Sequence, residues 1–442
     1  MFIKNKIYDW KSLNDLEKIK VLNRPASFLS QNVKNEVKNI LENVKKFGDS
    51  AIYKYSYIFD KIKINKIKIN CKKIKKENIK ISKKFKNAIF YAKRNIEKFH
   101  ILQNNLQDLS INIDKGINCR YTFNPINNIG IYIPKGVNSN LISTMLMLCI
   151  PANIAGCKNI VICSPPKISN ELLYVAKICN IRKIFQVGGA QAIAAMAFGT
   201  KTIPKVNKIF GPGNCYVTEA KSQISIMDNV CTSIDMIAGP SELLIISDKY
   251  SNPDFIASDL ISQLEHGKDS HVILITNHKP LFKKVFNSLR IQLNDIPRKN
   301  IVEFSLSNSK FILTDDLINC IKISNLYSPE HLAIYTKNFK SLLKYVENAG
   351  SIFLGQWSPE SIGDYASGTN HVLPTYGYAS SVSGIGLKDF IKNITIQELT
   401  YEGFLKLSNT VETLSSVEGL EGHRNSIYIR RKYLKEKYNL GF

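Results

Sequence analysis

Gln263 and His266 have the side-chain types and the spacing to bind a divalent metal. They are three residues apart in SQLEHG, which places both on one face of a helix that we expect to end at Gly267. An amide oxygen and an imidazole in this position can share one metal ion. A Gln and a His at this spacing are also common on solvated helix surfaces, so the pair indicates a metal site only together with further ligands.

Asp364 is a second possible cation ligand. It lies in SPESIGDYASGTNH (358–371), a segment rich in turn-forming residues in which no Lys or Arg adjoins it. A carboxylate there either caps backbone N–H groups or binds a cationic partner, and both interpretations remain open. Glu418 and His423 occur in VEGLEGHRNS, where Gly422 lets the chain turn before the histidine. The alternative for His423 is a solvated histidine in a C-terminal tail.

His331 is a possible general base. The string SPEHL predicts a helix start, with Ser328 as the N-cap, Pro329 at the first position and Glu330 in the first turn. The same cap recurs at 358–360 without a histidine, so His331 is not needed for capping. The helix dipole would lower the pKa of His331 and keep its imidazole neutral near pH 7. A solvated first-turn histidine is the alternative.

Strand and helix patterns alternate from about Asn128 onward, which predicts a parallel sheet with helices on both faces. Two strands there lead into glycine turns, VGGAQ at 187–191 and FGPGN at 210–214. Glycines in such turns let backbone N–H groups approach a ligand, and open parallel sheets bind ligands beyond these strand ends. Neither turn matches G-x-G-x-x-G, so the dinucleotide signal is weak. Asn214 is also explained as a helix N-cap.

The composition excludes several classes of protein. A chain of 442 residues with 44% hydrophobic residues is too long for one ordinary core and too apolar for disorder. The nine cysteines are scattered without any C-x-x-C, which argues against a disulfide framework or a thiolate zinc site. The N-terminus lacks the apolar run of a secretory signal, and Leu141–Ile150 is too short to span a bilayer. We therefore expect a cytoplasmic protein without a membrane partner.

The positive charge is concentrated in the first quarter of the chain. Residues 1–100 hold 26 basic and 9 acidic side chains, which accounts for +17 of the net +24. Lysines alternate with isoleucines at 61–69, a pattern typical of a strand with one solvated face, and arginine is almost absent there. We favour a solvated surface over a nucleic-acid site and expect no nucleic-acid partner.

Uncommon strings in fixed order, from about Gly130 to Arg431, resemble those of the histidinol dehydrogenase family. They are IYIPKG, IPANIAGC, VGGAQAIAA, KIFGPGN, VTEAK, IDMIAGPSE, SDLISQLEHG, SPEHL, WSPESIGDYASGTNHVLPT and EGHRN. The resemblance implies a zinc enzyme with one Zn²⁺ per subunit that completes histidine biosynthesis. It would oxidise L-histidinol through L-histidinaldehyde to L-histidine and reduce two NAD⁺. A homodimer with shared active sites is also implied.

The resemblance further implies roles for individual residues. The metal-ligand positions are occupied by Gln263, His266, Asp364 and His423, and the proton-transfer pair by Glu330 and His331. Substrate contacts fall on Ser241, Glu418, His331 and the four metal ligands, and NAD contacts on Tyr132, Gln191 and Asn214. One departure is Lys135, which stands where a glycine is common in the family and adds a cation beside the cofactor turn.

The expected fold class is α/β, with two Rossmann-like, incomplete parallel-sheet domains, a small N-terminal segment and a mainly helical C-terminal tail. The expected boundaries are 1–23 for the segment, 24–128 with 241–389 for a discontinuous domain carrying the metal and catalytic residues, 129–240 for the cofactor-side domain, and 390–442 for a tail exchanged between subunits.

Two other functions compete with the dehydrogenase. A zinc hydrolase would use Glu330 to activate metal-bound water, and it would not bind NAD⁺. A nucleic-acid-binding protein would use the basic first quarter, and its affinity would fall steeply with salt.

Overall fold

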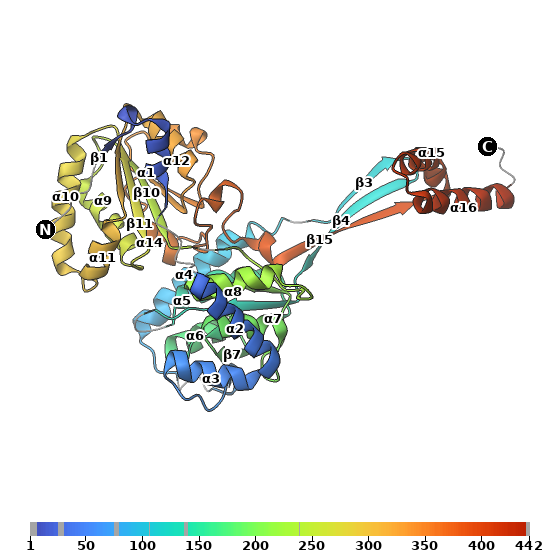
Figure 1. Cartoon of the computed structure of the whole chain (residues 1–442), viewed down its shortest axis with the longest axis horizontal. Helices are drawn as coiled ribbons and strands as arrows, with labels where there is room; N and C mark the ends of the chain where they lie inside the picture. Colours follow the sequence, from blue (N-terminus) through green and yellow to red (C-terminus); the bar gives the residue numbers. More distant parts are fainter. Residues whose placement is uncertain are drawn as a thin grey trace. The chain divides into compact units, whose positions relative to one another are not determined.

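The computed structural model describes residues 7–24, 31–74, 79–105, 107–136, 140–237 and 239–438. The chain divides into two compact units, one of Met1–Asn104 with Ile126–Phe390 and the other of Asn105–Pro125 with Ile391–Phe442 (Figure 1). Within the described ranges, no helix is both long and apolar enough to cross a bilayer.

The first unit contains a six-stranded, fully parallel sheet, here called sheet A. Its strand order is β1 (Ile7–Asp9), β12 (Lys310–Leu313), β11 (His271–Thr276), β10 (Glu242–Ser247), β13 (His331–Ile334) and β14 (Ser351–Leu354). The helices of this region are α1 (Asp15–Leu22), α9 (Pro253–Leu264), α10 (Pro280–Gln292), α11 (Lys299–Leu306), α12 (Leu317–Tyr327), α13 (Phe339–Leu342) and α14 (Glu360–Tyr365).

Helices cover both faces of sheet A because its central strands are apolar on both sides. In β10, Leu243 and Ile245 pack with α9, α10 and α11, while Leu244 and Ile246 pack with α12. Successive strand residues point to opposite faces, so a continuous apolar run is required where both faces are covered.

The first unit also contains a second six-stranded sheet, here called sheet B. Its order is β2 (Lys68–Asn70), β7 (Lys183–Gln186), β6 (Asn159–Ser164), β5 (Asn128–Tyr132), β8 (Lys208–Phe210) and β9 (Ser233–Ile234). All pairs are parallel except the β2–β7 pair. One apolar cluster involves α4 (Lys83–Ile101), α5 (Ile142–Ile154) and α6 (Asn170–Ile178), and the other involves α2 (Gln31–Phe47), α3 (Asp49–Asp60), α7 (Gly189–Phe198) and α8 (Cys215–Ile226).

The packing partners of residues 31–101 were not evident from the sequence. We expected residues 24–128 to form a domain with 241–389. In the structure β2 pairs with β7 of sheet B, and α2 and α4 contact helices of sheet B. The N-terminal β1 pairs instead with β12 of sheet A.

The second unit is a three-stranded antiparallel sheet followed by two helices. The strand order is β15 (Ile391–Leu399), β4 (Ile117–Pro125) and β3 (Leu109–Asp114), and α15 (Tyr401–Val417) packs against α16 (Glu421–Tyr438). The α/β class and the mainly helical C-terminal end are confirmed. Within the expected tail, Ile391–Leu399 nevertheless forms β15, whose partner β4 is about 270 positions earlier in the chain.

Two local predictions were wrong. Only Lys68–Asn70 of the alternating Lys–Ile segment is a strand. Ser328 does not start a helix: it ends α12 in the left-handed conformation (φ 53°), and His331 begins β13. The next residues pair with β10, and this long-range pairing overrides the local capping signal.

Candidate functional site

Glu330 and His331 are fixed by the first residue of the adjacent strand. A carboxylate oxygen of Glu330 (Oε2) accepts a hydrogen bond from the Glu242 backbone N–H at 2.8 Å, and His331 Nδ1 lies 3.0 Å from the Glu242 carbonyl oxygen. A carbonyl only accepts, so Nδ1 carries the hydrogen and Nε2 of the neutral ring is left as the acceptor. Nε2 is buried and has no partner among the described residues. His331 therefore presents a free basic nitrogen.

Burial, rather than a helix dipole, sets the protonation of this pair. Desolvation lowers the pKa of His331 to about 3, so the imidazole of the metal-free chain is neutral. Desolvation also raises the pKa of the Glu330 carboxyl well above its usual value, although the hydrogen bond from Glu242 opposes the shift. A carboxyl with a raised pKa can exchange protons nearer to neutrality than an ordinary glutamate.

Two of the expected residues, His266 and Asp364, converge beside His331 together with Glu360, which was not expected there. Ligand atoms of His266, Glu360 and Asp364 all lie within 4.8 Å of one another. Asp364 Oδ1 is 4.0 Å from His331 Nε2, and Glu360 Oε1 is 3.5 Å from His331 Nδ1. His266 lies in the turn directly after α9, Glu360 and Asp364 lie on α14, and these two helices pack against each other.

Gln263 joins this cluster through Glu360. Its side chain lies in the last turn of α9 and is fully buried. With its nitrogen facing Glu360, the Gln263 amide donates to both carboxylate oxygens, at 2.9 Å to Oε2. That orientation leaves the amide oxygen of Gln263 available to another group.

The cluster carries unbalanced negative charge. Among the described residues no Lys or Arg forms an ion pair with Glu330, Glu360 or Asp364. Burial raises the pKa of Asp364 to about 6, although the neighbouring His266 opposes the shift. Burial also raises the pKa of Glu360 well above its usual value, and repulsion by Asp364 and Glu330 is a further cause. The His266 residue as a whole is exposed, but desolvation of its imidazole lowers the pKa of this group, and the negative charge of Asp364 opposes the shift. Carboxylate and amide oxygens with an imidazole, without thiolate, suit a divalent cation in an open site.

Ser241 and His266 line one cavity of about 460 Å³, together with Asn214, Tyr376 and Tyr378. Asn214 also lines a second cavity of about 460 Å³, whose wall includes Tyr132 and Gln191. The structure thus brings all three expected cofactor residues together at one cavity. Asn214 also caps α8, as the alternative interpretation held, by accepting from the Val217 N–H at 3.2 Å.

The FGPGN turn is held by a buried ion pair that the sequence did not reveal. Lys221 and Asp235 form this pair, and their side chains are only 3% and 0% exposed. Lys221 Nζ donates to the Gly211 carbonyl at 3.0 Å, and Asp235 Oδ2 accepts from the Gly211 N–H at 2.8 Å. Gly211 has φ +117°, and an added Cβ would lie 2.2 Å from the Tyr132 carbonyl oxygen. This position requires glycine.

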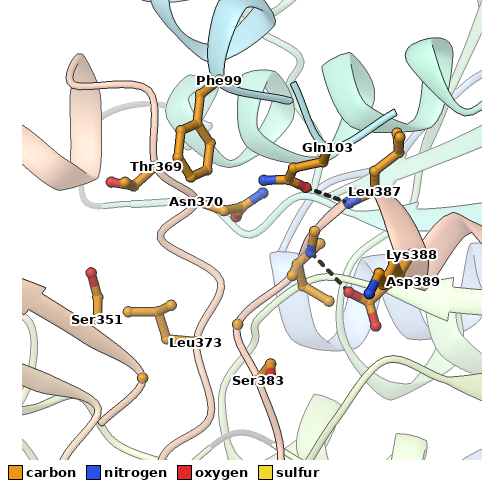
Figure 2. Close-up of a pocket in the computed structure, with 14 residues that line it drawn as sticks. Phe99, Gln103, Ser351, Thr369, Asn370, Leu373, Ser383, Leu387, Lys388 and Asp389 are labelled. Carbon is orange, nitrogen blue, oxygen red and sulfur yellow. Dashed lines mark hydrogen bonds between the residues drawn. The ribbon is translucent and has the colours of Figure 1, made fainter. Parts of the chain in front are cut away.

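A further cavity of about 480 Å³ lies against the loop at 383–389 (Figure 2). Gln103 accepts from the Leu387 N–H at 2.9 Å, and Asp389 accepts from the Gly386 N–H at 2.8 Å. Because these side chains hold the loop backbone, they are not free to bind a ligand. We do not assign the reaction to this cavity.

Two residues near the cluster were missed as site residues. Glu360 was treated as part of a cap, although an acidic residue four positions before Asp364 on a short helix was a usable signal. His371 Nδ1 donates to the Asp364 backbone carbonyl oxygen at 2.7 Å, because a carbonyl only accepts. Its signal was its place in the same loop.

Glu418 and His423 belong to the second unit, where both are exposed. Glu418 ends α15 and His423 lies in the first turn of α16. The cluster described above is built from the first unit alone.

Comparisons with known proteins give one consistent result. The family model for histidinol dehydrogenase matches residues 23–431. The histidinol dehydrogenase of Buchnera aphidicola subsp. Schizaphis graminum is 53% identical over 98% of this chain and 99% of its own length. That of Escherichia coli K12 is 48% identical over the same shares. The crystal structure of histidinol dehydrogenase from Elizabethkingia anophelis matches with a TM-score of 0.90 and 41% identity, over 98% of this chain and 100% of that chain.

Proposed function

This chain belongs to the histidinol dehydrogenase family, and on that premise we propose that it oxidises L-histidinol to L-histidine through L-histidinaldehyde, in the cytoplasm, with one Zn²⁺ per subunit and two NAD⁺ per turnover. The observation that carries the proposal is the cluster of His266, Glu360 and Asp364 beside the free Nε2 of His331.

We propose Gln263, His266 and Asp364 as zinc ligands, completed by His423 of the partner subunit. The donor types fit, and the surplus of carboxylates at the cluster favours a divalent cation. When bound, zinc would supply a Lewis acid that orients the substrate and lowers the pKa of its hydroxyl group. NAD⁺ would accept the hydride in each oxidation.

Side chains of the protein transfer the protons and bind the cofactor and the substrate. His331 Nε2 takes the hydroxyl proton while Tyr132, Gln191 and Asn214 hold the cofactor, which is a proximity and proton-transfer mechanism. Glu330, next to His331, accepts a proton from the water that adds to the aldehyde. Ser241 and the partner subunit's Glu418 bind the substrate.

A homodimer with shared sites is supported by the apolar surface of the second unit. Leu109 and Ile111 alternate along β3, so they share one face, and each is at least 60% exposed. Ile113, at an irregularity in the pairing of β3 with β4, is also 62% exposed. Leu414 and Val417 of α15 are also exposed, at 58% and 82%. Several large apolar side chains exposed on one small unit typically mark a protein interface. A second copy of the chain would cover them and bring His423 to a site.

Purified, zinc-loaded protein mixed with L-histidinol and NAD⁺ should produce NADH. His331→Gln, which keeps the side chain's size and polarity, should lower the rate by about 10²–10⁴-fold if His331 acts as the base. A folded, zinc-loaded sample that binds no NAD⁺ and forms no NADH would point to the hydrolase alternative. Tight, salt-sensitive binding of DNA or RNA would point to the third function.

A further inference from the structure

The cavity that Tyr132, Gln191 and Asn214 line contains a fourth polar side chain, Asp60. Asp60 is the last residue of α3, and nothing in the sequence had marked it. Its Oδ2 atom is buried and has no hydrogen-bond partner among the described residues. Gln191 Oε1, in the same cavity, is also buried without a partner in that part of the chain. The cavity therefore presents two acceptors that lack donors.

The position of Asp60 is unfavourable for folding. Desolvation raises the pKa of its carboxyl to about 6, and the positive charge of Lys135, on the same cavity wall, only partly opposes this. The C-terminal end of a helix also disfavours a negative charge. A buried acceptor without a donor costs free energy, and such groups are concentrated at binding sites. Since no contact within the described residues explains Asp60, a ligand that brings donors would.

The cavity suits a nucleotide in other respects. Phe59 and Tyr216 contribute aromatic rings to its wall, and Lys135 contributes a cation. Aromatic rings can pack on a base, and a cation can face a phosphate. A ribose between these groups offers two vicinal hydroxyl donors to a carboxylate.

We propose that Asp60 accepts hydrogen bonds from the vicinal hydroxyls of a ribose of the nicotinamide dinucleotide. This inference rests on the proposed function, because it takes the cavity to be the dinucleotide site. Asp60 is then a binding residue for the cofactor, and its unfavourable burial is relieved when the cofactor enters.

The test is the affinity for NADH in the absence of substrate, read from nicotinamide fluorescence on the full-length protein. Asp60→Asn keeps the shape of the side chain but removes its charge. We expect this variant to raise the Kd for NADH by about tenfold or more, the usual loss for a hydrogen bond to a charged group. Asp228→Asn removes the same charge from an exposed position outside the cavity. It should leave the Kd unchanged.

Thermal unfolding separates binding from structure. The folded pKa of Asp60 is raised, so its ionisation destabilises the fold as pH rises through about 4 to 6. At pH 7 Asp60→Asn should therefore unfold at the same or a higher temperature than wild type. If Asp60 served only to stabilise the fold, Asp60→Asn would instead lower the unfolding temperature.

NADPH distinguishes the two riboses. If Asp60 holds the adenosine ribose, Asp60→Asn will weaken NADH binding. It will also reduce the ratio of the NADH affinity to the NADPH affinity, because the wild-type carboxylate repels the 2′-phosphate of NADPH. If Asp60 holds the nicotinamide ribose, both affinities will fall by the same factor. An unchanged Kd for NADH in Asp60→Asn would overturn the inference while leaving the dehydrogenase intact. Wild-type protein that neither binds NADH nor oxidises histidinol would overturn the proposed function itself.

Discussion

Replacing Glu360 by glutamine tests whether this buried carboxylate supports the proposed zinc site. Glu360 is 3% exposed, and it accepts the amide hydrogens of Gln263, which leaves the Gln263 oxygen available to a metal. Glu360→Gln retains an acceptor for Gln263 but removes one negative charge. Glu360→Leu removes both the charge and the acceptor.

The size of the effect follows from charge and distance. The ligand atoms of the cluster lie within 4.8 Å of one another. One negative charge about 5 Å from a divalent cation contributes about 7 kcal/mol at an effective dielectric constant of about 20. Desolvation and proton competition offset most of this. We therefore expect Glu360→Gln to weaken zinc binding by about 10- to 100-fold, as is usual for groups that support metal ligands. Glu360→Leu should weaken it further, because the buried Gln263 amide loses its acceptor.

The assay is competition for zinc against a chromophoric chelator at fixed pH, with exposed Glu347→Gln as the charge-matched control. Burial raises the pKa of Asp364 to about 6, and zinc binds only the ionised carboxylate, so the wild-type affinity should rise as pH rises through about 6. In metal-free protein at pH 8, Glu360→Gln should not lower the unfolding temperature, because it removes repulsion between carboxylates. Unchanged zinc affinity in both Glu360 variants would refute this reasoning. Complete loss of zinc in Glu360→Gln would contradict a supporting role and make Glu360 a direct ligand.

Three further predictions concern the cofactor turn and the shared site. Lys221→Met leaves Asp235 buried without its partner, so it should destabilise the fold by about 3–5 kcal/mol in denaturant titrations; a loss within experimental error would show the ion pair to be dispensable. Gly211→Ala forces a Cβ toward the Tyr132 carbonyl at φ +117°, and it should cost about 1–3 kcal/mol and weaken NADH binding; wild-type stability would contradict the strain argument. Asp364→Ala and His423→Ala should each be inactive, yet their co-expression should restore about one quarter of wild-type activity, because half of the dimers are hybrid and each hybrid has one complete site. No recovery in demonstrably mixed dimers would argue against shared sites.

Local patterns predicted the parts of the fold that depend on neighbouring residues. The alternation of strands and helices after Asn128 was visible because each strand of a parallel sheet is a short apolar run and each helix has its own periodicity. The helix that carries Gln263 and the cap at Asn214 were predicted for the same reason. Both depend on a few adjacent residues.

Features that depend on distant partners were not predictable in this way. Ser328 resembles an N-cap, but pairing of β13 with β10 makes His331 the start of a strand. The segment of β15 was included in the mainly helical tail. Its partner β4 lies far away in the sequence, so no neighbouring residues indicated that it would form a strand. The partners of residues 31–101 were misjudged for the same reason. A short stretch of sequence does not show which distant strand its residues will pair with.

Several residues of the candidate site were named from the sequence, but their arrangement in space was not predicted. Spacing alone suggested Gln263 with His266, whereas their association with Asp364, about 100 positions later, came only from resemblance to a family. Glu360 and Asp60 were missed, because their roles arise from burial beside other groups. Burial of a single carboxylate is a property of the folded chain that its neighbours in sequence do not encode.

The most direct measurement is the yield of NADH from limiting L-histidinol with zinc-reconstituted protein and excess NAD⁺. We expect two NADH per histidinol, with histidine as the product. Removal of zinc should abolish this activity, and added zinc should restore it. One NADH per histidinol with released aldehyde would contradict the two-step oxidation, and full activity in metal-free protein would contradict the zinc site.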